Sequence, residues 1–333
     1  MIIWLKQGCD PELAYREAQP YYGHLIHDEG RAVLVISGKI KDLPEPLAPY
    51  TEKFVATGSD FQLASRMFKS STRRVDLGGG VVVGGDTRHC VLITGPCSVE
   101  SEAQIESCAQ LCVETGVKIL RAGAFKPRTA PYSFQGLGIK GLELLAKMRE
   151  KYGLSIITEV RDATHVEAVI EYSDIIQVGA KAMYDQGILR ACGRITKPVL
   201  IKRGFGTTLQ ELVQASEFVL AGGNPNVLVC ERGIRTFETK TRFTLDLCGV
   251  AWLKEYANLP VVLDPSHAMG YAYGVPDLAR ACLAMGVDGL LIETHPCPSE
   301  ALSDAAQQLN FDQFKNLALS LRKLAPVVDR HLV

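Results

Sequence analysis

Neither charge predominates in this sequence, because 36 Lys and Arg residues stand against 37 Asp and Glu residues, which gives a formal net charge of −1. Aromatic residues are also scarce, at 7% of the chain. Proteins that bind nucleic acid carry a basic patch or stripe, and single-strand binders interleave it with aromatics. Acidic membrane surfaces attract clusters of basic residues. The sequence therefore predicts no nucleic acid and no membrane as partner, although a local cationic pocket is compatible with it.

Long apolar runs are missing as well. No run approaches the roughly 18 residues that would suggest a membrane span. The apolar stretch at residues 1–6 is short, and the polar residues 7–10 end it. It lacks the features of a secretory signal peptide. We therefore expect a cytoplasmic protein.

The ten cysteines include no C-x-x-C pair. A zinc ribbon or a thioredoxin-type motif is therefore not expected. Most of them lie in apolar stretches, as Cys230, Cys248 and Cys282 do, which is typical of reduced, buried thiols. With 47% hydrophobic and 22% charged residues, the composition excludes a disordered chain, a collagen and a coiled coil.

Residues 1–69 have a rhythm of their own and no cluster of catalytic residue types. A helix pattern, capped by Asp10 and opened by Pro11, and a Pro-rich segment alternate with four strand patterns. This order is β-α-β-β-α-β, which predicts a small α+β ferredoxin-like domain over residues 1–69. Residues 70–89 are expected to form a linker and a two-stranded hairpin with glycine turns.

From Cys90 onward, short apolar runs alternate with helical stretches. Eight such runs occur, at 90–95, 117–123, 155–160, 174–180, 198–202, 226–231, 260–264 and 288–293. They suit a buried parallel sheet. The length of chain from this point to its end is close to that of a (β/α)8 barrel, which is about 250 residues. We predict an α/β fold with such a TIM barrel over residues 90–333. A doubly wound open sheet is the alternative, but it usually shows a glycine fingerprint where this chain has GPCSVES.

Polar residues follow these runs at the point where each strand ends, which is where such barrels carry their active sites. They are Cys97, Arg121, Lys126, Arg128, Thr129, Glu159, Gln177, Lys181, Lys202, Arg203, Glu231, Arg232, Asp264, Ser266, His267, Glu293, His295 and Asp304. The strands themselves are apolar. One rim of the barrel is therefore predicted to concentrate the chemistry.

Seven of these residues are cations, which would repel one another unless anions fill the mouth of the barrel. We expect two or three of them to pair with Glu159, Glu231 or Asp264. The others favour a multiply charged anionic substrate, because phosphates and carboxylates are the groups that such side chains bind. The seven are Arg121, Lys126, Arg128, Lys181, Lys202, Arg203 and Arg232.

A second set combines one thiol, one imidazole and two carboxylates, from Cys97, His267, Glu293 and Asp304. Mixed soft and hard ligands suit Mn, Fe, Co or Zn better than Mg or Ca. The spacing alone leaves two alternatives open. Cys97 could be a buried thiol, and His267 could be a general base without a metal.

The motifs GPCSVES, LRAGAFKPRTAPYSFQGLG, VLIKRG, CERGIRTFE, DPSHAMG and IETHPCPSEALSD resemble the type I-beta 3-deoxy-D-arabino-heptulosonate 7-phosphate (DAHP) synthases, over about residues 90–325. The resemblance implies a transferase that condenses phosphoenolpyruvate with erythrose 4-phosphate and releases phosphate, at the start of the shikimate pathway. It also implies one divalent metal ion (Mn, Fe, Co or Zn) and no organic cofactor. The front region looks like the regulatory domain of some members.

The resemblance also implies roles for individual residues. Cys97, His267, Glu293 and Asp304 would be the metal ligands, and Lys126 and Glu159 would be proton carriers beside them. The implied contacts of phosphoenolpyruvate are Arg121, Lys126, Lys202 and Arg232, with Ala180 and Lys181 near its phosphate and Arg203 on the same rim. Those of the aldose phosphate are Arg128, Thr129 and Asp264.

One position departs from the family pattern. Where the family usually reads GAR, this chain reads GAKAMYD, so Lys181 stands in place of an arginine. Lysine keeps the charge but loses the bidentate fork. Weaker phosphoenolpyruvate binding is one expected consequence, and a paralogue of secondary metabolism with another aldehyde is the other.

Two rival functions differ from this one. Octulosonate 8-phosphate synthases resemble the barrel, but they lack KPRT and usually show an asparagine-rich loop there. A purely regulatory protein on an inactive barrel would have lost rim residues, which this chain retains.

The resemblance further implies that residues 1–69 bind tyrosine or phenylalanine between subunits of a homodimer or homotetramer. A domain that only stabilises the oligomer is the alternative.

Overall fold

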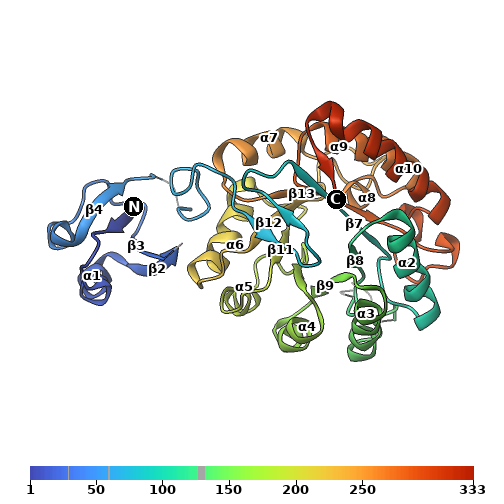
Figure 1. Ribbon diagram of the computed structural model, residues 1–333, viewed down its shortest axis with the longest axis horizontal. Coiled ribbons are helices and arrows are strands. Elements are labelled where there is room, and N and C mark those ends of the chain that lie inside the picture. Colours follow the sequence, from blue (N-terminus) through green and yellow to red (C-terminus); the bar gives the residue numbers. More distant parts are fainter. Residues whose placement is uncertain (29, 59–60, 127–131) are drawn as a thin grey trace.

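The computed structural model describes residues 1–28, 30–58, 61–126 and 132–333. It shows a small sheet followed by a large barrel (Figure 1). The predicted substrate contacts Arg128 and Thr129 lie outside the described residues.

The first part is a four-stranded antiparallel sheet in the order β2-β3-β1-β4. Its strands are β1 (Ile2–Leu5), β2 (His24–Asp28), β3 (Arg31–Val35) and β4 (Thr51–Val55). Helix α1 (Pro11–Ala18) buries Ala14 and Ala18 in a core shared with Ile3 and Leu34 of the sheet. The Asp10 side chain accepts a hydrogen bond from the backbone N–H of Glu12 and thereby caps the helix as predicted.

The second helical segment of this part, η2 (Glu45–Tyr50), is a 3-10 helix. Pro46 and Pro49 lie inside it, and a proline has no N–H with which to continue an α-helical ladder. The small antiparallel sheet is thus present, whereas the ferredoxin-like classification of residues 1–69 stays a prediction.

The glycine-rich segment forms the predicted hairpin from β5 (Val75–Asp76) and β6 (Val82–Val83). Its apolar side chains pack against inward-facing barrel residues such as Val91 and Ile93. Gly84, after β6, has a φ of +71°, and a Cβ there would lie 1.9 Å from the carbonyl oxygen of Arg73. The hairpin therefore closes the end of the barrel opposite the strand ends, and its tight exit requires glycine.

The second part is a closed parallel barrel of eight strands. They are β7 (His89–Gly95), β8 (Ile119–Arg121), β9 (Ser155–Val160), β10 (Ile175–Val178), β11 (Val199–Lys202), β12 (Val227–Glu231), β13 (Val261–Leu263) and β14 (Gly289–Glu293). Each pairs with the next, and β14 pairs with β7 to close the ring. The predicted (β/α)8 barrel is confirmed, and the open-sheet alternative is wrong.

Helices cover the outside of the barrel (Figure 1). They are α2 (Glu102–Thr115), α3 (Ile139–Tyr152), α4 (Val166–Tyr172), α5 (Gln186–Gly193), α6 (Leu209–Ala221), α7 (Leu247–Tyr256), α9 (Val275–Ala284) and α10 (Phe311–Leu324). A short helix, α8 (Pro265–Met269), follows β13, and β15 (His331–Leu332) adds to the edge of β7. Within the described residues, no helix is long and apolar enough to cross a membrane.

Residues 61–68 attach the small sheet to the barrel beside α6 and α7. Phe61, Leu63 and Ala64 belong to the barrel's outer hydrophobic core, and Phe61 packs edge-on against Trp252. The Glu217 carboxylate of α6 accepts hydrogen bonds from the backbone N–H groups of Gln62 (2.7 Å) and Ala64 (2.6 Å). This stretch, which we expected to belong to the first domain, therefore packs as part of the barrel's outer surface.

Candidate functional site

A cavity of about 250 Å³ opens at the carboxyl ends of the barrel strands. It is lined by Arg121, Lys126, Glu159, Ala180, Lys181, Lys202, Phe205, Arg232, Arg242, Phe243, His267 and Asp304. Six of these side chains are Lys or Arg, and only Glu159 and Asp304 are acidic. The lining thus has the cationic excess that the sequence predicts.

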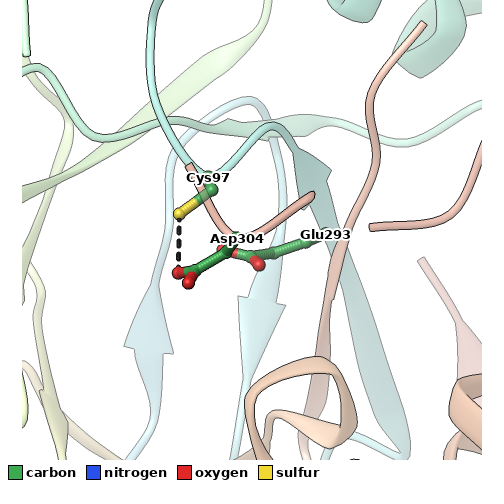
Figure 2. Close-up of side chains that lie close together, drawn as sticks. All are labelled: Cys97, Glu293 and Asp304. Atoms are coloured by element: carbon green, nitrogen blue, oxygen red, sulfur yellow. Dashed lines mark hydrogen bonds between the residues drawn. The ribbon is translucent and has the colours of Figure 1, made fainter. Parts of the chain in front are cut away.

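A group of metal-binding donor types lies at one wall of this cavity. Ligand atoms of Cys97, Glu293 and Asp304 all lie within 4.8 Å of one another. Figure 2 shows the three side chains converging, with the Cys97 Sγ 3.1 Å from Oδ2 of Asp304. Cys97 follows β7, Glu293 ends β14 and Asp304 lies in the loop after β14, so closure of the barrel brings them together.

His267 completes the group from α8. Its Nε2 lies 3.5 Å from Oε1 of Glu293 and 4.0 Å from Oδ2 of Asp304. Its Nδ1 is 2.7 Å from Oδ2 of Asp264, which also caps α8 through the backbone N–H of His267. The Asp264 carboxylate therefore fixes the ring so that Nε2 faces the other three donors.

Burial sets the protonation of two of these donors. It raises the pKa of the Cys97 thiol to about 12, and nearby Glu293 acts in the same direction. It lowers the pKa of His267, which favours the neutral imidazole that binds metals. The Lys126 ammonium lies 3.0 Å from the Cys97 Sγ, where it favours the thiolate. One sulfur, one imidazole nitrogen and two carboxylates fit a divalent transition metal.

Several cations of the cavity are already paired with acids. Arg121 forms a fully buried ion pair with Glu293, and the Lys202 Nζ lies 2.6 Å from Oδ2 of Asp264. Arg232 differs, because its Nη1 is buried without a hydrogen-bond partner in the described structure. Its guanidinium lies 4.4 Å from the centre of the Phe243 ring. A buried guanidinium donor without a partner is costly, and an anion in the cavity would satisfy it.

Glu159 enters the cavity from the end of β9. Its Oε2 accepts a hydrogen bond of 2.7 Å from Nε2 of Gln177 on the neighbouring β10. A Cβ at Gly179 would lie 2.2 Å from Oε1 of Glu159, so only glycine leaves room for this carboxylate. The side chain is therefore held in one position, with its carboxylate at the cavity wall.

Two residues predicted as substrate contacts do not line the cavity. The Arg203 Nη1 lies 2.8 Å from Oε2 of Glu231 and 2.9 Å from Oδ2 of Asp246. Asp264 is fully buried, and both its oxygens are engaged by Lys202 and His267. Of the acids expected to pair with cations, Glu231 and Asp264 do so.

Sequence reasoning missed Phe205, Arg242, Phe243 and Gln307. The first three line the cavity, and Gln307 donates a hydrogen bond to Oε2 of Glu293. Arg242 and Phe243 lie more than ten residues beyond the end of β12, past the strand-end positions that carried the prediction. Arg242, the third Arg of the loop after β12 and the first one past CERGIRTFE, was the available signal.

The closed parallel barrel, its cationic cavity and its four convergent donors define a class of barrel enzyme that acts on anionic substrates beside a candidate metal site. Comparison with known proteins makes the class specific. Residues 64–330 match the DAHP synthetase I family, and the chain belongs to that family.

One relative, the phospho-2-dehydro-3-deoxyheptonate aldolase of Thermotoga maritima, is 40% identical over 98% of both chains. A crystal structure of the Thermotoga maritima DAHP synthase superposes with a TM-score of 0.80 at 38% identity, covering 100% of this chain and 99% of that one. A 2-dehydro-3-deoxyphosphooctonate aldolase from Syntrophotalea carbinolica is 33% identical over 73% of this chain and 94% of its own length.

Proposed function

We propose that this chain is a 3-deoxy-7-phosphoheptulonate synthase. It condenses phosphoenolpyruvate with erythrose 4-phosphate, gives 3-deoxy-D-arabino-heptulosonate 7-phosphate and phosphate, and so starts the shikimate pathway. The observation that carries the proposal is the group of three clustered donors with His267 beside it, at the wall of a cationic cavity in a chain of this family. Two phosphorylated substrates bring about four to five negative charges, which the lining offsets.

The cations divide between two tasks. Arg232, whose Nη1 lacks a partner, and Lys202, Lys126 and Arg121 are proposed to bind the carboxylate and phosphate of phosphoenolpyruvate. Ala180 and Lys181, at the opening, are proposed to lie near its phosphate. Arg128 and Thr129 are proposed for the phosphate of the aldose.

Two earlier assignments are revised. Arg203 is proposed to hold the loops after β11 and β12 together through Glu231 and Asp246, instead of binding substrate. Asp264 is proposed to orient His267 instead of contacting the hydroxyls of the aldose.

One divalent ion, of Mn, Fe, Co or Zn, is proposed to bind to Cys97, His267, Glu293 and Asp304. Such an ion supplies Lewis-acid polarisation of the aldehyde oxygen. C3 of phosphoenolpyruvate then attacks the aldehyde carbon, water adds to C2, and C–O cleavage of the resulting hemiketal phosphate releases phosphate. Lys126 and Glu159, both at the cavity wall, are proposed to carry the protons of these steps.

An octulosonate 8-phosphate synthase-like activity is the second candidate, because relatives with that name are about one-third identical to the barrel. The deoxyheptonate relative also covers the N-terminal part, and the octulosonate relatives do not reach that coverage. This difference favours erythrose 4-phosphate over arabinose 5-phosphate, and a secondary-metabolism aldehyde is a further alternative.

Purified protein, phosphoenolpyruvate and a panel of aldose phosphates, with phosphate release as the readout, test the proposal. We expect release with erythrose 4-phosphate, loss of release with a chelator and recovery with Mn²⁺ or Co²⁺. Greater turnover with arabinose 5-phosphate would replace the proposed substrate with the second candidate.

The N-terminal part is proposed to bind tyrosine or phenylalanine and to regulate the barrel in a homodimer or homotetramer. A cavity of about 670 Å³ on the small sheet is lined by Lys6, Cys9, Arg31 and Glu52, among others. Arg31 and Glu52 form an exposed ion pair there. Such a pair offers one group for the carboxylate and one for the ammonium of an amino acid.

A further inference from the structure

The backbone around Asp304 does little to direct its side chain toward the other proposed metal ligands. It lies in the loop after β14 with a left-handed φ of +48°, and its side chain is partly exposed. Nevertheless, its Oδ2 lies 3.1 Å from the Cys97 Sγ and 4.0 Å from Nε2 of His267. Other side chains must therefore hold the carboxylate in this direction.

Arg242 contacts the outward oxygen of the same carboxylate. Its Nη1 lies 3.3 Å from Oδ1 of Asp304 and 2.6 Å from Oε1 of Gln307. The guanidinium thus occupies Oδ1 and leaves Oδ2 facing the sulfur and the imidazole.

Gln307 holds the second carboxylate, that of Glu293, in a similar way. It is 1% exposed, and its Nε2 donates a 2.5 Å hydrogen bond to Oε2 of Glu293. Oε1 of Glu293, which also pairs with Arg121, faces Nε2 of His267 at 3.5 Å. Because Arg242 can only donate, it fixes the amide with its oxygen outward and its nitrogen toward Glu293.

The loop that carries Arg242 is itself anchored. The backbone N–H of Arg242 donates to the carbonyl of Met269, and that of Phe243 donates to the carbonyl of Ala268. Phe243 also stacks on Phe205, with 5.7 Å between ring centroids. The loops after β12, β13 and β14 are therefore tied together at this point.

We propose that Arg242 and Gln307 are positioning residues that direct one oxygen each of Asp304 and Glu293 toward the proposed metal. They restrict both carboxylates to one inward donor atom and thereby raise the affinity for the ion. The inference rests on the proposed metal site, but it does not depend on which aldose the enzyme uses.

The test is Co²⁺ binding to the full-length protein after a chelator has removed its metal. Calorimetry measures the affinity, and the absorption of the cobalt–thiolate bond reports binding at Cys97. Arg242→Ala and Gln307→Leu are each expected to weaken Co²⁺ binding by about 10–100-fold, as is typical of groups that orient metal ligands. Arg242→Lys should restore part of the loss, because an ammonium can reach one of the two oxygens. The Co²⁺ affinity of the double variant should fall by less than the product of the two single losses, because the two side chains are hydrogen-bonded to each other and act on the same pair of carboxylates.

Arg235→Ala is the matched control. Arg235 lies in the same loop, and its guanidinium is 4.4 Å from the Phe205 ring centre, but it contacts neither carboxylate in the described contacts. Its Co²⁺ affinity should equal that of the unmodified protein. Unchanged Co²⁺ affinity in Arg242→Ala would overturn the inference, as would an equal loss in Arg235→Ala. The Co²⁺ binding experiment contains no substrate. If the binding results are as expected but the condensation assay fails, only the proposed function is refuted, and the inference about Arg242 and Gln307 stands.

Discussion

The Cys97 side chain combines two properties that bear on metal binding. It is fully buried, and it has an ammonium 3.0 Å from its sulfur. A buried structural cysteine needs no such partner, and the equally buried Cys108 of α2 has no cationic side chain among its described contacts. The surroundings of Cys97 therefore favour a ligand that loses its proton when an ion binds.

Cys97→Ala is expected to abolish metal binding and turnover together. The metal affinity should fall by more than the about 10–100-fold loss that is typical of substituting residues that only orient the metal ligands. Calorimetric titration of the stripped protein and phosphate release measure the two effects. Cys108→Ala, the control, should cost about 1 kcal/mol of stability and leave metal affinity intact. Full activity of Cys97→Ala in the presence of chelator would refute the metal mechanism.

Lys181 stands at the position where the resemblance to the family predicts an arginine, and two substitutions test its role. If it contacts the phosphate of phosphoenolpyruvate, Lys181→Ala should raise KM for that substrate by about 10–150-fold, the equivalent of about 1.5–3 kcal/mol for a charged hydrogen bond. Lys181→Arg should leave KM equal or lower it, because the guanidinium can bind in bidentate fashion.

Steady-state kinetics at saturating aldose separates these outcomes. Lys140→Ala, on the exposed face of α3, is the control and should change neither KM nor kcat. If neither substitution of Lys181 moves KM, the side chain does not bind this phosphate.

At the scale of elements, the site depends on where parallel strands end. Cys97 and Glu293 come from opposite ends of the barrel sequence, and they meet because β14 pairs with β7. The hairpin of β5 and β6 closes the other end with apolar side chains. The polar groups of the cavity therefore lie at one rim. The small sheet reaches the barrel through residues 61–68 and helix α6.

Glu217 on α6 governs this attachment. Burial raises its pKa above the ordinary value, although hydrogen bonds from Ala64 and Gln62 act to lower it. The folded state then binds this proton more tightly than the unfolded state does. The contribution to stability is complete below the unfolded pKa of about 4.3 and decreases as pH rises through the folded value.

Glu217→Gln should remove this pH dependence while it keeps an oxygen that can accept the two bonds. The difference in unfolding free energy, wild type minus Glu217→Gln, should fall as pH rises above about 4.3 and then level off. Glu217→Ala should cost about 1–3 kcal/mol for each buried N–H left without a partner. Urea unfolding across this pH range measures both, with the exposed Glu171→Gln as a control. A difference that rises with pH would contradict the assignment.

At the scale of the whole molecule, the small sheet lies beside the barrel that carries the candidate site (Figure 1). An effector controls the barrel only if it binds one arrangement of the two parts better than another, with a coupling of typically about 1–3 kcal/mol. We propose that a rigid-body shift of the small sheet relative to the barrel, which shields the barrel mouth, is the motion involved.

We expect tyrosine or phenylalanine to inhibit the full chain. A truncated chain that begins at Phe61, so that the residues packed on the barrel are retained, should stay active and insensitive. Arg31→Ala should lose the response while its turnover stays normal, which tests the same idea without truncation. Turnover across a series of tyrosine, phenylalanine, tryptophan, chorismate and prephenate is the measurement.

Light scattering of each protein separates regulation from a role in assembly alone. Loss of the oligomer in the truncated chain, together with no response of the full chain to any of the five compounds, would favour the alternative that this part only stabilises the assembly. An equal response in both chains would place the effector on the barrel.

The sequence by itself determined the eight strands, the barrel and the rim on which chemistry collects. These features depend on local patterns: apolar runs, glycine turns and the polar residues directly after each run. It also predicted Cys97, His267, Glu293 and Asp304 as one group, because residues at strand ends must share a rim once the sheet is parallel and closed. Their roles as ligands stay a prediction.

Only the tertiary structure decided how the charges pair. Arg203 and Arg232 come from the ends of neighbouring strands, yet one is committed to two carboxylates and the other keeps a buried donor without a partner. Arg242 reaches Asp304 from 62 positions away. Such pairings depend on the directions of side chains in loops, for which no local periodicity exists. The same reason explains why residues 61–68, predicted as part of the first domain, pack on the barrel instead.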